Sequence, residues 1–282
     1  MGTNDEILTP TSLGNLKVTK AGDLEGPERV LLFGNPGSGK TPFLGSANRV
    51  AAFSPCLFVN VDREDGCKSL KWTYPEVDIV HTPVFMDLYE VLEALWKKKM
   101  AGYRSLIIDG GTTAQLRGIE HIYRDDKQLI RKFTDPTVPS RQNNGWDKSK
   151  GQMSAFFDVL CDFPIHVFMT AWSRNVAPEP TGRGSMGQER GELWQPDFTP
   201  AVFNAACGRF SSLLFMRKGR VSGQRLLKSR DTPTNIGRDR GNRLPPVLTN
   251  PIMEDLAKYW GLDCSPVNGG AERYTEEKDK DD

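Results

Sequence analysis

The residue types best suited to chemistry lie in one short stretch of the chain: Gly34, Asn35, Pro36, Gly37, Ser38, Gly39, Lys40 and Thr41. Glycines at these spacings let main-chain N–H groups wrap around a chain of phosphates, and the helix expected next points its positive end at them. Lys40 is then placed to reach the β- and γ-phosphates, and the Thr41 hydroxyl to bind Mg²⁺. We therefore predict that this stretch binds ATP together with magnesium.

A metal-binding carboxylate is expected at Asp109. This residue ends the apolar run of residues 105–109, and a phosphate-binding loop of this kind needs a carboxylate at such a strand end to hold the magnesium shell. The alternative is an ordinary aspartate that caps the turn after a strand. On the first interpretation, Thr41 and Asp109 form the metal site.

A carboxylate that activates water is expected on a neighbouring strand end. Asp62 and Glu64 follow directly after the apolar residues 57–61, so either could face the terminal phosphate as a general base. Asp62 is the first choice and Glu64 the second. A solvated acidic turn remains open as the alternative for each of them.

Two further segments are rich in cations. Residues 217–243 hold nine Lys and Arg against two Asp, a density that suits contacts to nucleic-acid phosphates or to ATP across a subunit boundary. A solvated basic hairpin is the alternative. In residues 173–198, Arg174, Arg183 and Arg190 occur with Trp194 among glycines, which is compatible with gripping a single strand of DNA.

The elements that must position these residues alternate along the chain. Apolar runs predict strands at residues 30–33, 57–61, 77–81, 105–109 and 165–170, and helical spacing predicts helices at 41–52, 86–100 and 150–161. Such alternation indicates an α/β fold whose mostly parallel sheet has helices on both faces. Ligands bind at the carboxyl ends of such strands, where the phosphate-binding loop and both acidic sites are expected.

The remaining segments connect or extend this core. Residues 110–145 are polar and predict an insertion with a short helix at 118–133, and residues 173–198 predict a long loop. A terminal hairpin is expected from residues 211–216 and 224–228. We predict an N-terminal extension at 1–28, one ATPase domain at 29–260, and an acidic, disordered tail at 261–282.

Composition narrows the class of protein. The chain has 282 residues, 38% hydrophobic and 26% charged, with a formal net charge of +1, so nucleic-acid binding requires a local basic patch. The five cysteines are widely spaced and form no C-x-x-C pair, which argues against a zinc knuckle or a disulfide framework. No apolar run approaches the ~20 residues that span a bilayer. We expect a cytoplasmic protein without a membrane partner.

Taken in order, these motifs resemble the RecA/RadA-like P-loop ATPase core. They are similar in particular to small phage-encoded nucleotide-binding proteins related to single-strand annealing recombinases. The matching segments after the glycine-rich stretch read V-N-V-D-R-E-D-G (59–66), L-I-I-D (106–109), V-F-M-T-A-W (167–172), P-D-F-T-P-A-V (196–202) and G-R-D-R-G-N-R-L-P-P (237–246). The resemblance covers residues 29–260.

The resemblance implies roles for particular residues. The hydrolytic carboxylate falls on Asp62 or Glu64, and residues 111–145 and 173–198 would line a path for single-stranded DNA. Basic residues that act on a neighbour's ATP map to Arg238 and Arg240, or else to Lys228 and Arg230. Where relatives carry a polar sensor of the γ-phosphate, this chain has Trp172, whose indole donates but cannot accept a hydrogen bond.

Function is predicted accordingly. The leading hypothesis is an ATPase that acts on single-stranded DNA in phage recombination or replication, as a homo-oligomeric ring or filament in the host cytoplasm, with a single-strand-binding protein as a possible partner. The second is a nucleotide-dependent assembly or scaffold protein without DNA-stimulated activity. A small-molecule kinase ranks lowest, because the sequence shows no Arg-rich lid with an acceptor site.

Overall fold

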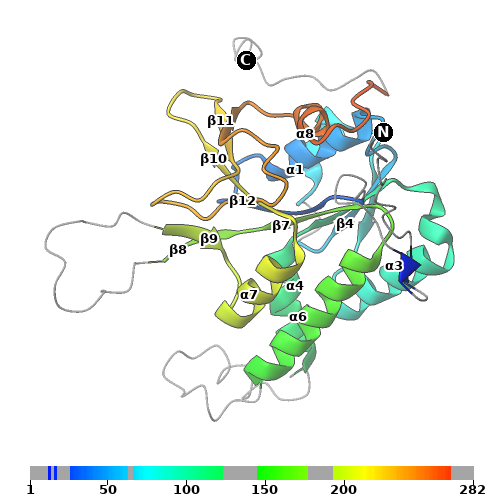
Figure 1. Cartoon of the computed structure of the whole chain (residues 1–282). Coiled ribbons are helices and arrows are strands. Elements are labelled where there is room, and N and C mark those ends of the chain that lie inside the picture. Colours follow the sequence, from blue (N-terminus) through cyan, green and yellow to red (C-terminus); the bar gives the residue numbers. More distant parts are fainter. Residues whose placement is uncertain are drawn as a thin grey trace, which may run out of the picture.

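A nine-stranded sheet organises the chain (Figure 1). The structure is a computed structural model, which describes residues 26–62, 66–122, 145–176 and 193–267, and the backbone of two short paired strands, β1 (Ser12–Leu13) and β2 (Leu16–Lys17). The strands of the main sheet are β3 (Arg29–Phe33), β4 (Cys56–Asn60), β5 (Asp78–His81), β6 (Ser105–Asp109), β7 (His166–Ala171), β10 (Ser212–Lys218), β11 (Arg225–Lys228), β12 (Arg238–Asp239) and β13 (Val247–Thr249).

The sheet is mostly parallel. Its order is β13-β11-β10-β3-β7-β6-β4-β5, with β12 paired to β10. Strands from β10 to β5 in this order are parallel. At the other edge the pairings are antiparallel: β11 and β12 with β10, and β13 with β11. The predicted α/β architecture, including the C-terminal hairpin, is therefore confirmed.

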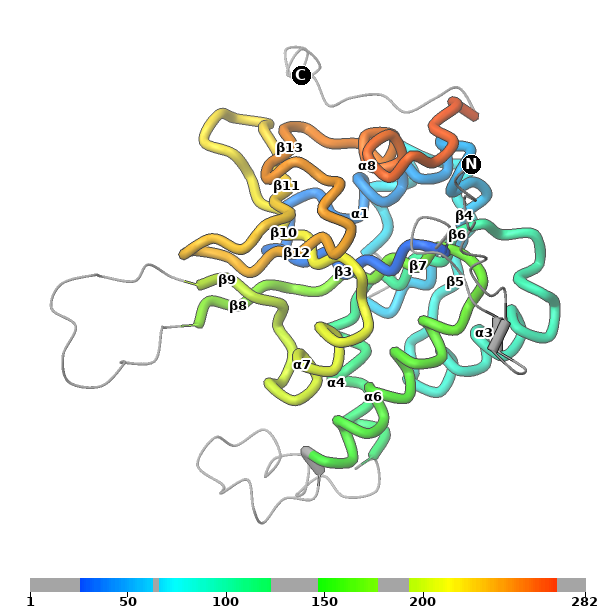
Figure 2. Tube along the Cα trace, viewed as in Figure 1, coloured from blue at the N-terminus to red at the C-terminus, as the bar shows by residue number. Residues whose placement is uncertain are grey.

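Helices cover both faces of the sheet (Figures 1 and 2). They are α1 (Lys40–Gly45), the 3₁₀ helix η2 (Ser46–Arg49), α2 (Lys68–Thr73), α3 (Phe85–Lys97), the 3₁₀ turn η3 (Lys99–Gly102), α4 (Gly111–Ile122), α6 (Gly145–Asp162), α7 (Pro200–Arg209) and α8 (Met253–Trp260). Helices α3, α4, α6 and α7 share one apolar core, and α1, α2 and α8 share the other.

Alternation along the strands divides these two cores. In β3, Leu31 and Phe33 belong to the core under α6, whereas Val30 and Leu32 belong to the core under α1. All five residues of β3 are buried, as expected of a parallel strand with both faces covered. Each fully buried Leu or Phe contributes about 1.5–3 kcal/mol, so the central strands provide a rigid base for the loops at their carboxyl ends.

Three sequence predictions of helices need correction. The helix predicted at 41–52 ends earlier, as α1 and η2. Helix α4 begins at Gly111, not near residue 118, because Ala114, Gly118 and Ile119 give it one small apolar face in an otherwise polar sequence. Helix α6 begins at Gly145, five residues before the predicted start at 150.

The prediction of one long loop at residues 173–198 is wrong at both ends of that segment, because each end is a strand. Strands β8 (Ser173–Val176) and β9 (Leu193–Pro196) pair antiparallel there, with Ser173 opposite Pro196. Each strand has only four residues, too few to show an apolar alternation in the sequence. Residues 123–144 and 177–192 lie outside the described part of the chain.

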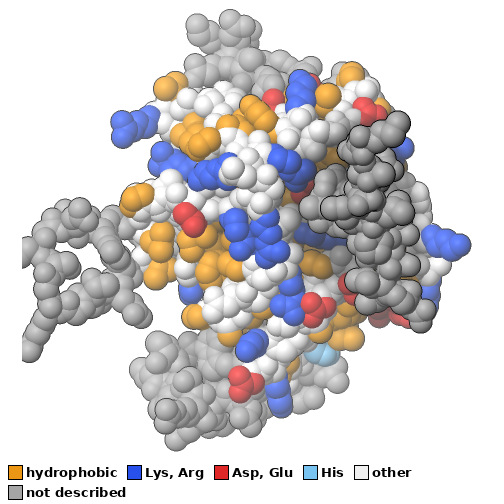
Figure 3. Space-filling model, in the orientation of Figure 1, with side chains coloured by type: hydrophobic (Ala, Val, Ile, Leu, Met, Phe, Trp, Pro, Cys, Tyr) orange, Lys and Arg blue, Asp and Glu red, His pale blue; other side chains and the backbone are white. Residues whose placement is uncertain are grey.

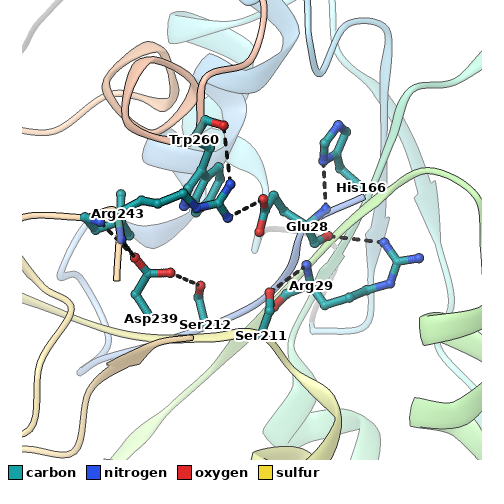
Figure 4. Close-up of polar contacts among 9 residues, drawn as sticks. Glu28, Arg29, His166, Ser211, Ser212, Asp239, Arg243 and Trp260 are labelled. Atoms are coloured by element: carbon teal, nitrogen blue, oxygen red, sulfur yellow. Dashed lines mark hydrogen bonds and ion pairs between the residues drawn. The ribbon is translucent and has the colours of Figure 1, made fainter. Parts of the chain in front are cut away.

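The amino ends of the strands are tied together by polar contacts (Figure 4). Glu28, 8% exposed in its side chain, forms an ion pair of 2.6 Å with Arg243, which also donates to the Trp260 carbonyl. The Glu28 N–H donates to Nδ1 of His166, whose pKa is lowered to about 4 mainly by burial. These contacts join the start of β3 to the C-terminal region.

The structured chain continues past the predicted domain end. Residues 263–267 hydrogen-bond with the segment at η2: Ala52 N–H donates to the Asp263 carbonyl at 2.9 Å, and Val267 N–H to the Arg49 carbonyl at 3.0 Å. The predicted tail boundary at 261 therefore lies inside the described fold. Residues 268–282 are outside the described part.

Candidate nucleotide-binding site

The glycine-rich stretch forms the turn between β3 and α1. Gly37 and Gly39 have φ values of 73° and 94°, a left-handed conformation that favours glycine. Gly34 has no room for a side chain, because a Cβ there would lie 2.1 Å from the Met216 carbonyl oxygen of β10. The local sequence is thus matched to a phosphate-binding loop at the carboxyl end of the central strand β3.

Lys40 lies within this loop. Its ammonium donates to the carbonyls of Gly34 at 2.8 Å and Asn35 at 3.1 Å. Burial lowers the pKa of Lys40 to about 8, against the opposing effect of Asp109 and Asp62. A cation held in a cradle of main-chain groups with so little water around it is suited to bind phosphate oxygens.

Asp109 lies at the centre of a hydroxyl network. Its Oδ2 accepts from Thr41 at 2.8 Å and its Oδ1 from Thr170 at 2.7 Å. Thr170 Oγ1 in turn accepts from the Gly110 N–H at 2.9 Å. Burial raises the pKa of Asp109, and the two threonine hydrogen bonds oppose this effect. A cation nearby would stabilise the charged form of this buried carboxylate.

These residues fit a magnesium ion. Mg²⁺ prefers oxygen ligands and is commonly held by one or two carboxylates, with phosphates and waters completing its shell. The Thr41 hydroxyl and Asp109 carboxylate supply such oxygens side by side. Among the described residues, no group of three or more His, Cys, Asp or Glu could hold a metal ion. Phosphate oxygens of the nucleotide and water would complete the shell of the expected ion.

Asp62 lies against the end of β6. Its Oδ1 accepts a short hydrogen bond from Thr113 of α4, and a Cβ on Gly110 would lie 2.8 Å from the same oxygen. The structure thus brings Asp62 to the strand end that carries Asp109. Glu64, the other sequence candidate, lies outside the described residues, and the choice between them stays a prediction.

The arginines expected to act on a neighbour's ATP bind groups of their own chain. Arg238 donates to the carbonyls of Cys207 and Phe210, and Arg240 to those of Cys207 and Gly208. Both therefore donate hydrogen bonds to main-chain carbonyls at the C-terminal end of α7.

The other pair of candidates is also engaged within the chain. Lys228 donates to the Asn235 side chain at 2.9 Å, and Arg230 to the Leu244 carbonyl at 3.0 Å. A role on a neighbour's nucleotide remains a prediction for all four residues, and it would require these contacts to be exchanged.

Of the predicted DNA-binding residues, the structure describes only Arg174. It lies on β8, where its Nε and Nη2 are 3.0 and 2.8 Å from the side-chain amide oxygen of Gln195 on β9. Arg183 and Arg190 are outside the described residues. Trp194 stacks on Phe215 with 6.3 Å between ring centroids, which agrees with a packing role.

Three residues in β7 and directly after it make contacts that sequence reasoning did not anticipate. Thr170 was part of the V-F-M-T-A-W segment but had no assigned role, although its place at the end of a strand was a usable signal. Ser173 of β8 donates to the Asn35 side chain at 2.5 Å. Trp172, 39% exposed, donates its main-chain N–H to Thr112 Oγ1 at 3.0 Å. The segment after β7 is therefore bound directly to the phosphate-binding loop.

Together, the fold and this site define a P-loop NTPase. The described residues include no helix long and apolar enough to cross a bilayer. A family model described as AAA domain matches residues 27–241, and the chain belongs to that family. Nucleotide binding and the P-loop ATPase class follow from this membership.

Comparison with solved structures finds likenesses of fold, among them the following one. A solved structure described as the RadB recombinase is similar, with a TM-score of 0.41 and 13% sequence identity, covering 72% of this chain and 80% of that one. None of the curated proteins matches this chain in sequence.

Proposed function

We propose that this chain hydrolyses ATP and acts on single-stranded DNA in recombination or replication. The observation that carries the hydrolytic part is the contact of Thr41 and Thr170 with the two oxygens of Asp109, next to the buried Lys40. This arrangement gathers a cation, a hydroxyl and a carboxylate where a triphosphate would lie. A phage-encoded origin and a ring or filament of identical chains belong to the same proposal.

Each residue would act on the substrate in a defined way. The loop amides and Lys40 would hold the phosphates, and Thr41 and Asp109 would hold Mg²⁺, which supplies positive charge to the transferred phosphoryl group. Asp62 or Glu64 would orient water for in-line attack and accept its proton. Arg238 and Arg240, or Lys228 and Arg230, would stabilise the developing charge on a neighbouring chain.

The DNA part is supported by the path of the chain after β7. Ser173 is hydrogen-bonded to the loop at Asn35, and β8 leads from there to Arg174 and into the segment expected to line the DNA. Lys and Arg side chains also gather over β10 to β12 in Figure 3. Such an arrangement would let DNA and nucleotide affect each other through residues 172–174.

A phosphate-release assay with and without a single-stranded oligonucleotide tests this proposal. We expect ATP turnover to rise with the oligonucleotide, and DNA binding to weaken steeply as salt is added, because phosphate contacts release counterions. Turnover that does not respond to DNA, with no DNA binding at low salt, would contradict the DNA part alone.

A second candidate is a nucleotide-dependent assembly protein that hydrolyses ATP slowly. One observation favours it: Arg238, Arg240, Lys228 and Arg230 all donate to groups of their own chain. If those contacts persist in the oligomer, no cation from a neighbour stabilises the transition state. Sizing with and without ATP separates the candidates, since this one requires ATP-dependent assembly without DNA stimulation.

A further inference from the structure

Three glycines of the phosphate-binding loop face the hairpin formed by β10 and β11. Strand β10 runs parallel to β3 and beside it, which places the hairpin against the loop. A Cβ on Gly34 would lie 2.1 Å from the Met216 carbonyl oxygen, one on Gly39 would lie 2.6 Å from Arg225 Nε, and one on Gly37 would lie 3.9 Å from Lys218 Nζ. A strand and two cations thus lie against the glycines of the loop.

Lys218 and Arg225 are held as a pair. They are directly opposite each other in the β10–β11 register. The backbone of Arg225 is fixed from its other side, because its N–H donates to the Asn250 side chain and its carbonyl accepts from the Asn250 N–H, both at 2.8 Å. Because this backbone is already fixed, binding an anion has to order only the side chain of Arg225 and not its strand.

The hairpin and the loop enclose a cavity of about 370 Å³. Gly37 forms part of its wall, and three cations line it: Lys218, Arg220 and Arg225. No carboxylate is among the described residues that line it. The field in such a cavity favours a negatively charged ligand, and the shared wall at Gly37 places that ligand next to the phosphate-binding loop.

We infer that Lys218 and Arg225 bind phosphate oxygens of the nucleotide in the loop, as a second cationic contact from the same chain. This inference rests on the proposed binding of ATP. The guanidinium and ammonium groups are both suited to phosphate. The pair belongs to the same chain as the loop, so this contact to the nucleotide needs no oligomer. The contacts expected from a neighbouring chain do need one.

Calorimetric titration with ATP and with ADP, each with Mg²⁺, tests the inference. The variant Lys218→Gln/Arg225→Gln removes both charges, and Lys97→Gln/Lys98→Gln is the matched control at the exposed end of α3. We expect the first variant to raise Kd by on the order of tenfold or more, the typical effect of losing hydrogen bonds to charged groups. The control should bind like the wild-type chain.

Salt dependence separates a charge contact from a structural effect. Screening weakens the wild-type contact, so the gap between wild type and variant should narrow as salt is added. The swap Lys218→Arg/Arg225→Lys keeps both charges and should restore most of the affinity. Thermal unfolding checks that each protein is folded, and Lys218→Gln alone, at an exposed position, serves if the double variant is unstable.

Unchanged affinity for ATP and ADP in the folded variant would overturn the inference. If this variant also binds a labelled single-stranded oligonucleotide more weakly, the result assigns the pair to polynucleotide phosphates. A wild-type chain that binds no ATP at all would instead contradict the proposed function, so the two failures are distinguishable.

Discussion

The Thr41 hydroxyl and the Asp109 carboxylate lie 2.8 Å apart, although 68 positions separate them in the chain. The contact exists because β3 and β6 are separated in the sheet by β7 alone, so that their carboxyl ends share one edge. Strand β7 supplies the third member, Thr170, to the other carboxylate oxygen. The site is therefore a property of strand order as much as of the glycine-rich motif.

The variant Asp109→Asn tests the metal assignment. It keeps the shape of the side chain and removes its charge, so we expect turnover to fall by on the order of a hundredfold, as for loss of one pre-organised polar group at a reacting phosphate. ATP affinity should also lose its dependence on Mg²⁺, measured by titration with and without a chelator. Asp263→Asn, at an exposed position in the segment that pairs with the region after η2, is the control. Full Mg²⁺ dependence in Asp109→Asn would exclude this carboxylate as a ligand.

Lys40 gives the site a predictable pH dependence. Its pKa is lowered to about 8 mainly by burial, and phosphate favours the protonated form. Above that pH the free protein holds a neutral amine, so binding ATP must take up a proton and the affinity must fall. Calorimetry at about pH 9 in two buffers of different ionisation enthalpy measures this uptake. Equal heats in both buffers, with constant affinity from neutral pH upward, would contradict a depressed Lys40 pKa.

The ion pair of Glu28 and Arg243 stabilises the fold at the amino ends of the strands, opposite the carboxyl ends that carry the phosphate-binding loop. Arg243→Met leaves the buried Glu28 carboxylate without its partner and should cost about 1–3 kcal/mol of unfolding free energy, less than a fully buried pair because Arg243 is partly exposed. The double variant Glu28→Gln/Arg243→Met should regain part of this loss, since the unpaired charge is gone. Urea unfolding gives the values for Glu28→Gln, for Arg243→Met and for the double variant. Simple additivity of the two single changes would show that the pair is not coupled.

Local signals predicted the part of the site that is local in sequence. The glycine-rich loop needs positive φ values at Gly37 and Gly39, and glycine at these positions predicts them. The continuous apolar run before Asp109 is typical of a buried parallel strand. The existence and type of β3, β4, β6 and β7 followed from such runs. The hairpin was likewise predicted from residues 211–216 and 224–228.

Long-range pairings could not be predicted in the same way. The sequence around Thr170 does not indicate that β7 lies between β3 and β6. The sequence around Arg225 does not indicate that its side chain lies against Gly39. The start of helix α4 was misplaced for a different reason: its polar composition masked a narrow buried face at Ala114 and Gly118. The internal contacts of Arg238 and Arg240 with the end of α7 depend on tertiary packing.

The most direct test of the account is phosphate release from ATP by the wild-type chain and by Lys40→Ala, each with Mg²⁺. Lys40 donates only to carbonyls of the loop in the described structure, so the variant should remain folded. We predict measurable turnover in the wild type and a decrease on the order of a hundredfold or more in the variant. Equal turnover in the two proteins would contradict the assignment of this loop as the site of hydrolysis.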